Sequence, residues 1–201
     1  LHLVRTAHRR TGSKNLCLAG GVALNAVANG RIRPETPFEE VYVQPAAGDS
    51  GIAVGAAYHV WNQELGMPRG FVMEHAYTGP QYGDAEYEEA IRAGGFTPER
   101  LDDDALYPFV AERIAEGDVV GWFQGRMEFG PRALGNRSIV TDPRRHDMKD
   151  ILNARIKHRE PFRPFAPSLL AEAAGEWYEQ DYTSPFMVLV YKTREDKRGE
   201  I

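Results

Sequence analysis

Cysteine is almost absent from this sequence, and so are long apolar runs. The single cysteine, Cys17, excludes an internal disulfide and makes a reducing, cytoplasmic setting the default expectation. Its place in the apolar run from Asn15 to Ala19 predicts a buried packing residue. Because no run approaches the roughly 20 apolar residues of a membrane span, we expect no membrane association. The start has neither an initiator Met nor a signal-peptide pattern, so we expect the chain to begin inside a longer polypeptide.

Acidic residues outnumber basic ones overall, but the basic ones are concentrated in one stretch. The net charge is -5, yet the stretch from Arg126 to Arg163 holds ten Lys and Arg residues against five acidic residues. A basic cluster in an otherwise acidic chain suits a small anionic ligand better than a long polyanion, which the remaining surface would repel. We therefore expect a small anion as partner and no nucleic acid.

The first third of the chain alternates short apolar runs with glycine turns. Asn15 to Ala19 and Glu40 to Gln44 read as strands, and each is followed by a glycine turn that opens a helix. This predicts an α/β unit over residues 1–65, with the end of a helix within residues 1–14 at the stop signal Gly12, a helix at 23–29 before Gly30, and one from Gly51 to about Leu65.

Residues 66–85 contain six glycines and prolines without any periodicity, which is typical of a linker. The remainder, residues 86–201, alternates again and predicts a second α/β or α+β unit. Leu106, Val110 and Ile114 recur every four residues on one helix face. The expected helices are 85–94, 104–116, 147–156 and 171–178, and the expected strands are 119–123, 138–140, 166–170 and 186–191.

Paired glycines between a strand and a helix mark the first candidate site. Gly20 and Gly21 would expose backbone N–H groups at a helix N-terminus, an arrangement that favours phosphate. A tight turn in which glycine only supplies positive φ remains the alternative. In the second turn, Gly48 to Gly51, the position of Asp49 favours helix capping over metal binding on spacing alone.

The loop from Gly125 to Ser138 is the most informative segment. It places three arginines between two apolar strands and stiffens them with Gly and Pro, which solvated surface arginines would not need. Arginine forks bind phosphate oxygens in pairs, and each charge-assisted bond contributes about 1.5 to 3 kcal/mol. A second stretch from Lys157 to Pro167 adds cations between three prolines. The cations expected to converge on one anion are Arg126, Arg132, Arg137, Lys157, Arg159 and Arg163.

A salt-bridged surface is the open alternative to such an anion site. In that case Glu128, Asp142, Asp150 and Glu160 would pair with the neighbouring bases, and no ligand would be needed.

Four segments resemble one known family. GRMEFGPRALGNRSI and KHREPFRPFAPSLL, at residues 125–139 and 157–170, closely resemble the C-terminal region of the nodulation-protein and antibiotic O-carbamoyltransferases, the NodU/CmcH type. LAGGVALN and PAAGDSGIAVGAA, at residues 18–25 and 45–57, resemble the same proteins just upstream. The resemblance covers nearly the whole chain in the right order.

The resemblance implies a fold and an activity. Residues 1–65 would end an actin-like ATPase-type transfer domain, and residues 86–201 would form most of a YrdC-like twisted-sheet domain that is incomplete at its C-terminus. The second domain would join carbamoyl phosphate and ATP, with Mg²⁺, into carbamoyl adenylate. The first, which holds an iron-type divalent metal such as Fe²⁺ in this family, would transfer the carbamoyl group to the hydroxyl of a small-molecule acceptor. The acceptor cannot be read from the sequence, and a homodimer remains an open option.

The resemblance also assigns residues by motif position. Arg132, Lys157 and Arg163 would be catalytic and bind carbamoyl phosphate or the adenylate, joined by Arg126, Arg137 and Ser138. Gly20, Gly21 and Asn25 would contact nucleotide. Asp49 would be a metal ligand, whereas the family's two metal-binding histidines lie upstream. The alternative is a YrdC-like RNA-modification or nucleotide-binding module without O-carbamoyl transfer.

Overall fold

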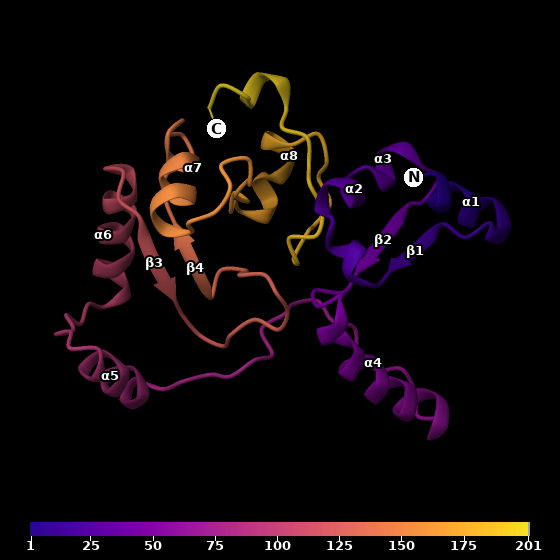
Figure 1. Cartoon of the computed structure of the whole chain (residues 1–201), viewed down its shortest axis with the longest axis horizontal. Helices are drawn as coiled ribbons and strands as arrows, with labels where there is room; N and C mark the ends of the chain where they lie inside the picture. The colour runs from indigo at the N-terminus through magenta and orange to yellow at the C-terminus, as the bar shows by residue number, and fades with distance from the viewer. Residues whose placement is uncertain (201) are drawn as a thin grey trace.

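The computed structural model describes residues 1–200. Figure 1 shows two groups of elements side by side, joined by an extended segment along the lower edge of the view. The N-terminal group holds the first two strands and lies on the right. The later elements lie on the left, and the C-terminal segment returns to pass beside α2.

The N-terminal group is built on two parallel strands. β1 (Asn15–Leu18) pairs with β2 (Glu40–Val43), with Leu18 opposite Val43. α1 (His2–Thr11) precedes them and ends at Gly12, whose left-handed φ of 65° confirms the predicted stop. Between the strands lie the 3₁₀ helix η1 (Gly21–Leu24), α2 (Ala26–Gly30) and α3 (Ile32–Glu35).

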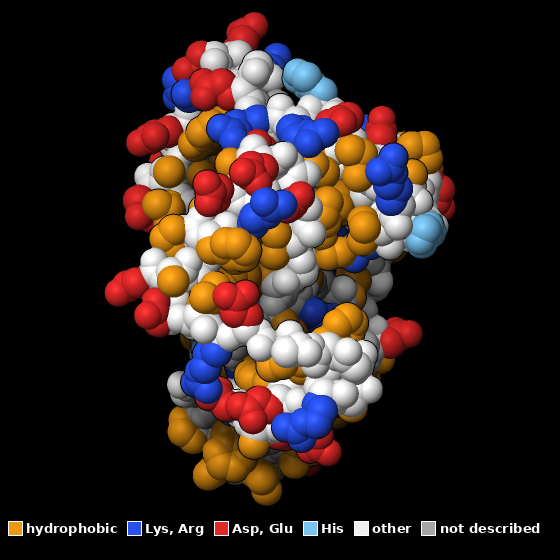
Figure 2. All heavy atoms as spheres, turned by 90° about the vertical axis from the view of Figure 1, so that its left-hand side faces the viewer, with side chains coloured by type: hydrophobic (Ala, Val, Ile, Leu, Met, Phe, Trp, Pro, Cys, Tyr) orange, Lys and Arg blue, Asp and Glu red, His pale blue; other side chains and the backbone are white. Residues whose placement is uncertain are grey.

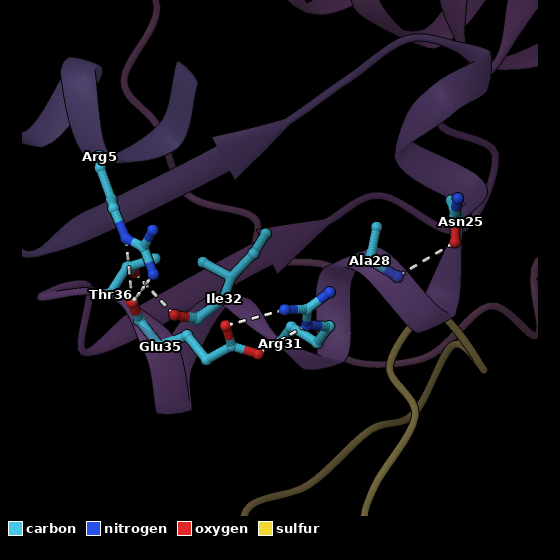
Figure 3. A network of polar contacts seen from close by, with 7 residues as sticks. All are labelled: Arg5, Asn25, Ala28, Arg31, Ile32, Glu35 and Thr36. Carbon is cyan, nitrogen blue, oxygen red and sulfur yellow. Dashed lines mark hydrogen bonds and ion pairs between the residues drawn. The ribbon is translucent and has the colours of Figure 1, made fainter. Parts of the chain in front are cut away.

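Side-chain hydrogen bonds explain why the N-terminal group contains several short helices. The predicted helix at 23–29 is split because Asn25 interrupts it: its Oδ1 accepts the Ala28 N–H at 3.1 Å and caps α2 (Figure 3). In the same view, Arg5 of α1 donates to the Glu35 carbonyl oxygen at 2.9 Å. Arg31 donates to the Glu35 carboxylate at 2.6 Å. The bond from Arg5 fastens α1 to α3, and the bond from Arg31 links the N-cap of α3 to its last residue.

The second glycine turn opens a long projecting helix. η2 (Asp49–Gly51), α4 (Ile52–His59) and the π-helical turn η3 (Val60–Glu64) follow one another, so the helix ends one residue short of the predicted Leu65. α4 extends away from the rest of the molecule in Figure 1. Most of its residues are exposed although its sequence is strongly apolar.

The connecting segment, residues 66–83, contains no helix or strand but is firmly placed at its centre. Ala76 is 1% exposed, and its carbonyl oxygen accepts the Phe129 N–H at 2.6 Å. Gly79 donates to the Met127 carbonyl oxygen at 2.9 Å. The segment therefore lies against the arginine-bearing loop of the second group.

The second group begins with two helices and an antiparallel strand pair. The three partly buried side chains of α6 within the helix are Leu106, Val110 and Ile114, which confirms the predicted inner face. Val120 lies opposite Val140 in the strand pair. The bounds are α5 (Asp84–Ala93), α6 (Asp103–Ala115), β3 (Val120–Phe123) and β4 (Arg137–Val140).

The remaining elements are short. They are α7 (Met148–Ile151), the π-helical turn η4 (Leu152–Ile156), η5 (Ala171–Ala173), α8 (Ala174–Trp177) and η6 (Glu195–Lys197). None of the helices within residues 1–200 has both the length and the apolar character that crossing a bilayer requires.

Two predicted strands are wrong. Residues 166–170 form no strand; they include Pro167, which has no N–H to donate to a ladder. Residues 186–191 form none either, because Met187 has a φ of 53° that breaks the extended backbone. Val190 instead donates to the Ala26 carbonyl oxygen of α2 at 3.1 Å. This segment therefore docks on a helix rather than on a sheet edge.

One buried cluster joins the two groups. Phe186 and Val188, each 4% exposed, pack with apolar residues of the N-terminal group and the connecting segment. The members are Ala23, Val43, Ala47, Ala76, Phe186 and Val188. The prediction that Cys17 is buried is wrong: it is exposed. Along β1, Leu16 and Leu18 turn to the covered face, and the alternate residues face outward on a side that residues 1–200 leave exposed.

Candidate functional site

A hollow of about 1070 Å³ lies at the carboxyl ends of β1 and β2. Gly20 follows one strand, Gly48 and Asp49 follow the other, and α4 and residues 68–73 complete the walls. In open α/β sheets, ligands bind at this end of parallel strands, where helix N-termini and glycine turns meet. The two glycine turns predicted from the sequence therefore share one hollow.

The two turns are tied together by backbone contacts. Gly20 has a φ of 96°, and its N–H donates to the Ala47 carbonyl oxygen at 2.8 Å. A Cβ at Gly51 would lie 2.3 Å from the Ala46 carbonyl oxygen, so glycine is required there. Gly21 is exposed and borders open space. Gly20 therefore has the positive φ of the tight turn, and its N–H is already bonded. Anion binding at Gly21 stays a prediction.

Asp49 does not cap the helix, which corrects the preference drawn from spacing. No side-chain bond closes the start of η2, and Asp49 lies exposed at the border of the hollow. His59 lines the same hollow but faces Glu64, with 3.4 Å between Nε2 and Oε1. Across residues 1–200, no three His, Cys, Asp or Glu side chains gather closely enough to hold a metal ion. Asp49 alone does not constitute a metal centre.

Aromatic rings line part of the hollow and were missed in the sequence. Tyr58 of α4 and Phe71 of the connecting segment stack with centroids 6.3 Å apart and planes 12° apart. Trp61 and Tyr42 border the same space. The spacing of Tyr58 and Trp61 by three residues on one helix was the available signal.

The arginine loop between β3 and β4 is organised by a buried acid. Glu128 is 8% exposed, and its Oε1 accepts the N–H groups of Leu134 at 2.8 Å, Asn136 at 2.8 Å and Arg137 at 3.2 Å. Burial by itself would raise the pKa of Glu128, but the backbone donors outweigh it and hold the pKa below its ordinary value. Glu128 is therefore a charged group inside the loop.

Arg132 links this loop to the first glycine turn. Its Nη2 donates to the Leu24 carbonyl oxygen at 2.8 Å, directly before Asn25. Its Nε is buried and has no hydrogen-bond partner within residues 1–200. Nearby, a Cβ at Gly130 would lie 2.9 Å from the Pro45 carbonyl oxygen, so the loop also meets the second turn closely. Arg132 thus carries a spare buried donor where the two groups meet.

The other predicted anion ligands lie elsewhere. Arg126, Arg137 and Lys157 are exposed, and the Ser138 hydroxyl accepts the Gly135 N–H at 3.1 Å. Neither they nor Arg132, Arg159 and Arg163 line the hollow at the strand ends.

The second basic stretch has its own organising residue. Asn153, 1% exposed, donates to the Arg163 carbonyl oxygen at 3.0 Å and accepts from Arg159 Nε at 2.7 Å. Arg159 also lies over the Phe165 ring, 4.5 Å from its centroid. Arg163 pairs with Glu160 at 2.8 Å, and both side chains are about half exposed. The segment is therefore folded around Asn153, with its charged ends in solvent.

The salt-bridged alternative holds for part of the basic region. Asp142 pairs with Arg144 at 2.8 Å, and Glu160 pairs with Arg163. Glu128 instead accepts backbone donors. Figure 2 shows acidic and basic side chains interspersed over the face that turns toward the viewer, without a continuous basic stripe on that face. Such mixed charge offers no track for a nucleic acid backbone there.

Comparison with known proteins identifies the family. Residues 1–58 match the carbamoyltransferase N-terminus and residues 111–201 match the carbamoyltransferase C-terminus. Together the two matches cover about three quarters of the chain. The chain belongs to the carbamoyltransferase family.

Individual relatives agree with this assignment. The chain is 49% identical over 208 residues to nodulation protein NolNO of Sinorhizobium fredii, covering 98% of this chain and 30% of that protein. It is 46% identical over 203 residues to nodulation protein NolO of Bradyrhizobium diazoefficiens, covering 98% and 36%. An uncharacterized protein of Synechocystis is 48% identical over 204 residues, covering 98% and 33%. The chain spans about a third of the length of these relatives.

Proposed function

We propose that this chain is part of an enzyme that transfers a carbamoyl group from carbamoyl phosphate to a hydroxyl of a small-molecule acceptor. Family membership supports the reaction class. The observation that carries the proposal is Arg132, whose buried Nε lacks a partner while its Nη2 contacts Leu24 beside the first glycine turn. A buried guanidinium donor without an acceptor is costly unless a ligand supplies one.

Carbamoyl phosphate would provide that acceptor. A phosphate oxygen at Nε would form a charge-assisted bond, worth about 1.5 to 3 kcal/mol. Lys157 and Arg163 would join it by closing of the 157–170 stretch, which contains no helix or strand. Little opposes that closing, because the exposed pair between Arg163 and Glu160 contributes at most about 1 kcal/mol. Arg126, Arg137 and Ser138 would form the outer part of the pocket.

ATP would activate the carbamoyl group. In the proposed sequence, water first cleaves carbamoyl phosphate into carbamate and inorganic phosphate, which leaves. A carbamate oxygen then attacks the α-phosphorus of ATP, and the bond from that phosphorus to the oxygen that bridges it to the β-phosphate breaks. Pyrophosphate leaves, and carbamoyl adenylate forms. Cations placed around the phosphates would neutralise the developing charge, and Mg²⁺ would accompany the ATP. The hollow bordered by Gly20 and Gly48 would hold the nucleotide of the transfer domain, with Gly21 and Asn25 nearby.

The proposed domain boundaries separate the activation of the carbamoyl group from its transfer. Residues 1–65 would belong to an actin-like transfer domain, residues 66–85 would connect, and residues 86–201 would belong to a YrdC-like activating domain. A divalent metal such as Fe²⁺ would polarise the transferred group in the intact transfer domain. Asp49 would contribute one carboxylate to it.

Pyrophosphate release by the full-length protein tests the proposal. We expect release only when ATP and carbamoyl phosphate are both present, and we expect Arg132→Ala to reduce it by at least about 100-fold, as losing one preorganised charge-stabilising donor does elsewhere. Arg100→Ala, which removes an exposed partner of Asp84, is the matched control and should leave the rate unchanged. Release that is equally fast in Arg132→Ala would refute the assignment.

A further inference from the structure

Glu128 is a buried charge for which the proposed reaction has no use. It is one of four buried polar or charged residues within the described chain, with Asn29, Asp142 and Asn153. The proposal above uses the arginines around it but assigns it no role. Its carboxylate contacts backbone alone: one oxygen takes three N–H groups, and the other, Oε2, is buried without a partner.

The three donors come from the far end of the loop that contains Glu128. Leu134, Asn136 and Arg137 are six, eight and nine residues away, so the carboxylate closes the chain between them into a ring. Converging backbone N–H groups of this kind commonly hold external anions. Here the protein's own carboxylate takes that place. Arg132 lies in the middle of the ring and reaches out from it to the Leu24 carbonyl oxygen.

Outside the ring, the loop is fastened at a few points. The Tyr77 hydroxyl donates to the Leu134 carbonyl oxygen at 2.7 Å, and Phe129 donates to Ala76 at 2.6 Å. These bonds seat the loop on the connecting segment. Asn136 also crosses the base of the loop, since its Nδ2 donates to the Arg126 carbonyl oxygen at 2.7 Å and its carbonyl oxygen accepts the Gln124 N–H at 3.0 Å, whereas Glu128 gathers the chain above that base. If the carboxylate were removed, three backbone N–H groups would lose their acceptor at once. These three are the hydrogen bonds of the Glu128 side chain within residues 1–200.

We propose that Glu128 is a positioning residue whose ionised carboxylate closes the loop and so aims Arg132 at the carbamoyl phosphate. It touches no substrate. This inference rests on the proposed function, because it assumes that Arg132 binds that anion.

The first test of this inference varies the charge of the side chain at residue 128. Glu128→Gln keeps an acceptor oxygen but makes its three hydrogen bonds neutral, which roughly halves their strength, and it places an NH₂ group where Oε2 has no partner. We expect carbamoyl phosphate to bind about tenfold more weakly, with the KM for ATP unchanged in the full-length enzyme. Glu128→Asp, which keeps the charge on a shorter side chain, should lose less. Glu116→Gln removes an exposed acid that pairs with Arg113, outside the proposed site, and should bind like wild type.

A double-mutant cycle separates positioning from general destabilisation. Dissociation constants for carbamoyl phosphate would be measured by calorimetry on the wild-type chain, Glu128→Gln, Arg132→Ala and the double variant, each checked for cooperative melting. If Glu128 acts through Arg132, its substitution has no further effect once Arg132 is gone. Additive losses, or wild-type affinity in folded Glu128→Gln, would overturn the inference while leaving the proposed function intact.

A second readout covers the case in which Glu128→Gln does not fold. Glu128→Asp would then be compared with wild type, and the Nε–H resonance of Arg132 would report its environment directly. An unmoved resonance together with unchanged affinity in Glu128→Asp, and in Glu128→Ala without added acetate, would overturn the inference. If the wild-type protein bound no carbamoyl phosphate, that result would refute the proposed function and this inference together.

Discussion

At the scale of single residues, the charged side chains of the basic region differ mainly in how far they are removed from water. Asp142 is 6% exposed and accepts two side-chain bonds from Arg144, at 2.8 Å each. The pair between Glu160 and Arg163 is half exposed. Water screens exposed pairs, so they add little to stability, whereas a buried acid makes stability depend on pH.

Asp142 should make the protein sensitive to acid. The side-chain bond from Arg144 lowers the pKa of Asp142 to about 2 from 3.8. A lowered folded-state pKa means that this contribution to stability is present above about pH 4 and is lost as the pH falls toward 2. We expect Asp142→Asn to be less stable than wild type at neutral pH and to flatten the fall in urea midpoint between these values. Asp84→Asn, in an exposed pair, serves as control. An unchanged slope would contradict this reading.

Residue roles were only partly predictable from the sequence. The pattern of arginine, glycine and proline indicated the loop that holds Arg132, and the family resemblance then selected Arg132 among its arginines. It could not indicate Glu128 as the centre of the loop, because that role depends on three backbone N–H groups turning inward together. The apolar run around Cys17 wrongly predicted that this residue is buried, because such a run does not reveal whether a sheet has one covered face or two.

At the scale of elements, the fold depends on close backbone approaches. Gly130 has a φ of 111°, and a Cβ there would lie 2.9 Å from the Pro45 carbonyl oxygen. The strand pairs β1 with β2 and β3 with β4 are short, so contacts of this kind supply much of the placement of the loops between them.

Gly130→Ala should loosen the arginine loop. The substitution forces a side chain into a left-handed conformation and against backbone atoms that cannot easily move, at a cost of about 1 to 3 kcal/mol. Gly55→Ala, in α4 with open space around its Cβ, should instead be neutral or stabilising by up to about 1 kcal/mol. Denaturant unfolding of the two variants measures the difference. Equal effects would show that the contact with Pro45 is unimportant.

Elements were predicted well where they are local and poorly where tertiary contacts decide. The apolar runs at β1 and β3 and the four-residue spacing in α6 carry enough information by themselves. The failure at residues 186–191 has a different origin: Phe186 and Val188 are buried, as in a strand, but the positive φ of Met187 aims the backbone at α2. Sequence periodicity does not record that partner.

At the scale of the whole molecule, the two groups share a core. Phe186 and Val188 from the C-terminal segment pack with Val43 at the end of β2, Ala47 in the turn after it, and Ala76 of the connecting segment. Asn29, 4% exposed, strengthens this junction by donating to the Val188 carbonyl oxygen at 3.0 Å. Groups joined in this way should unfold together.

Phe186→Ala should therefore destabilise both groups at once. Removing a buried phenyl ring costs about 3 to 5 kcal/mol, through lost transfer energy and the cavity that remains. We expect one cooperative transition at a lower midpoint, followed both by far-ultraviolet circular dichroism and by tryptophan fluorescence. Phe162→Ala, at a residue that is 79% exposed, should leave the midpoint in place. Two separate transitions in wild type would contradict a shared core.

The Nε–H resonance of Arg132 provides the most direct measurement of the central claim, that carbamoyl phosphate binds where the arginine loop meets the first glycine turn. It would be assigned by its loss in Arg132→Lys and followed during titration of the ¹⁵N-labelled chain with carbamoyl phosphate. We predict a saturable downfield shift as the unpartnered donor gains a phosphate oxygen. A resonance that stays in place while the anion binds elsewhere, or does not bind at all, would contradict the account.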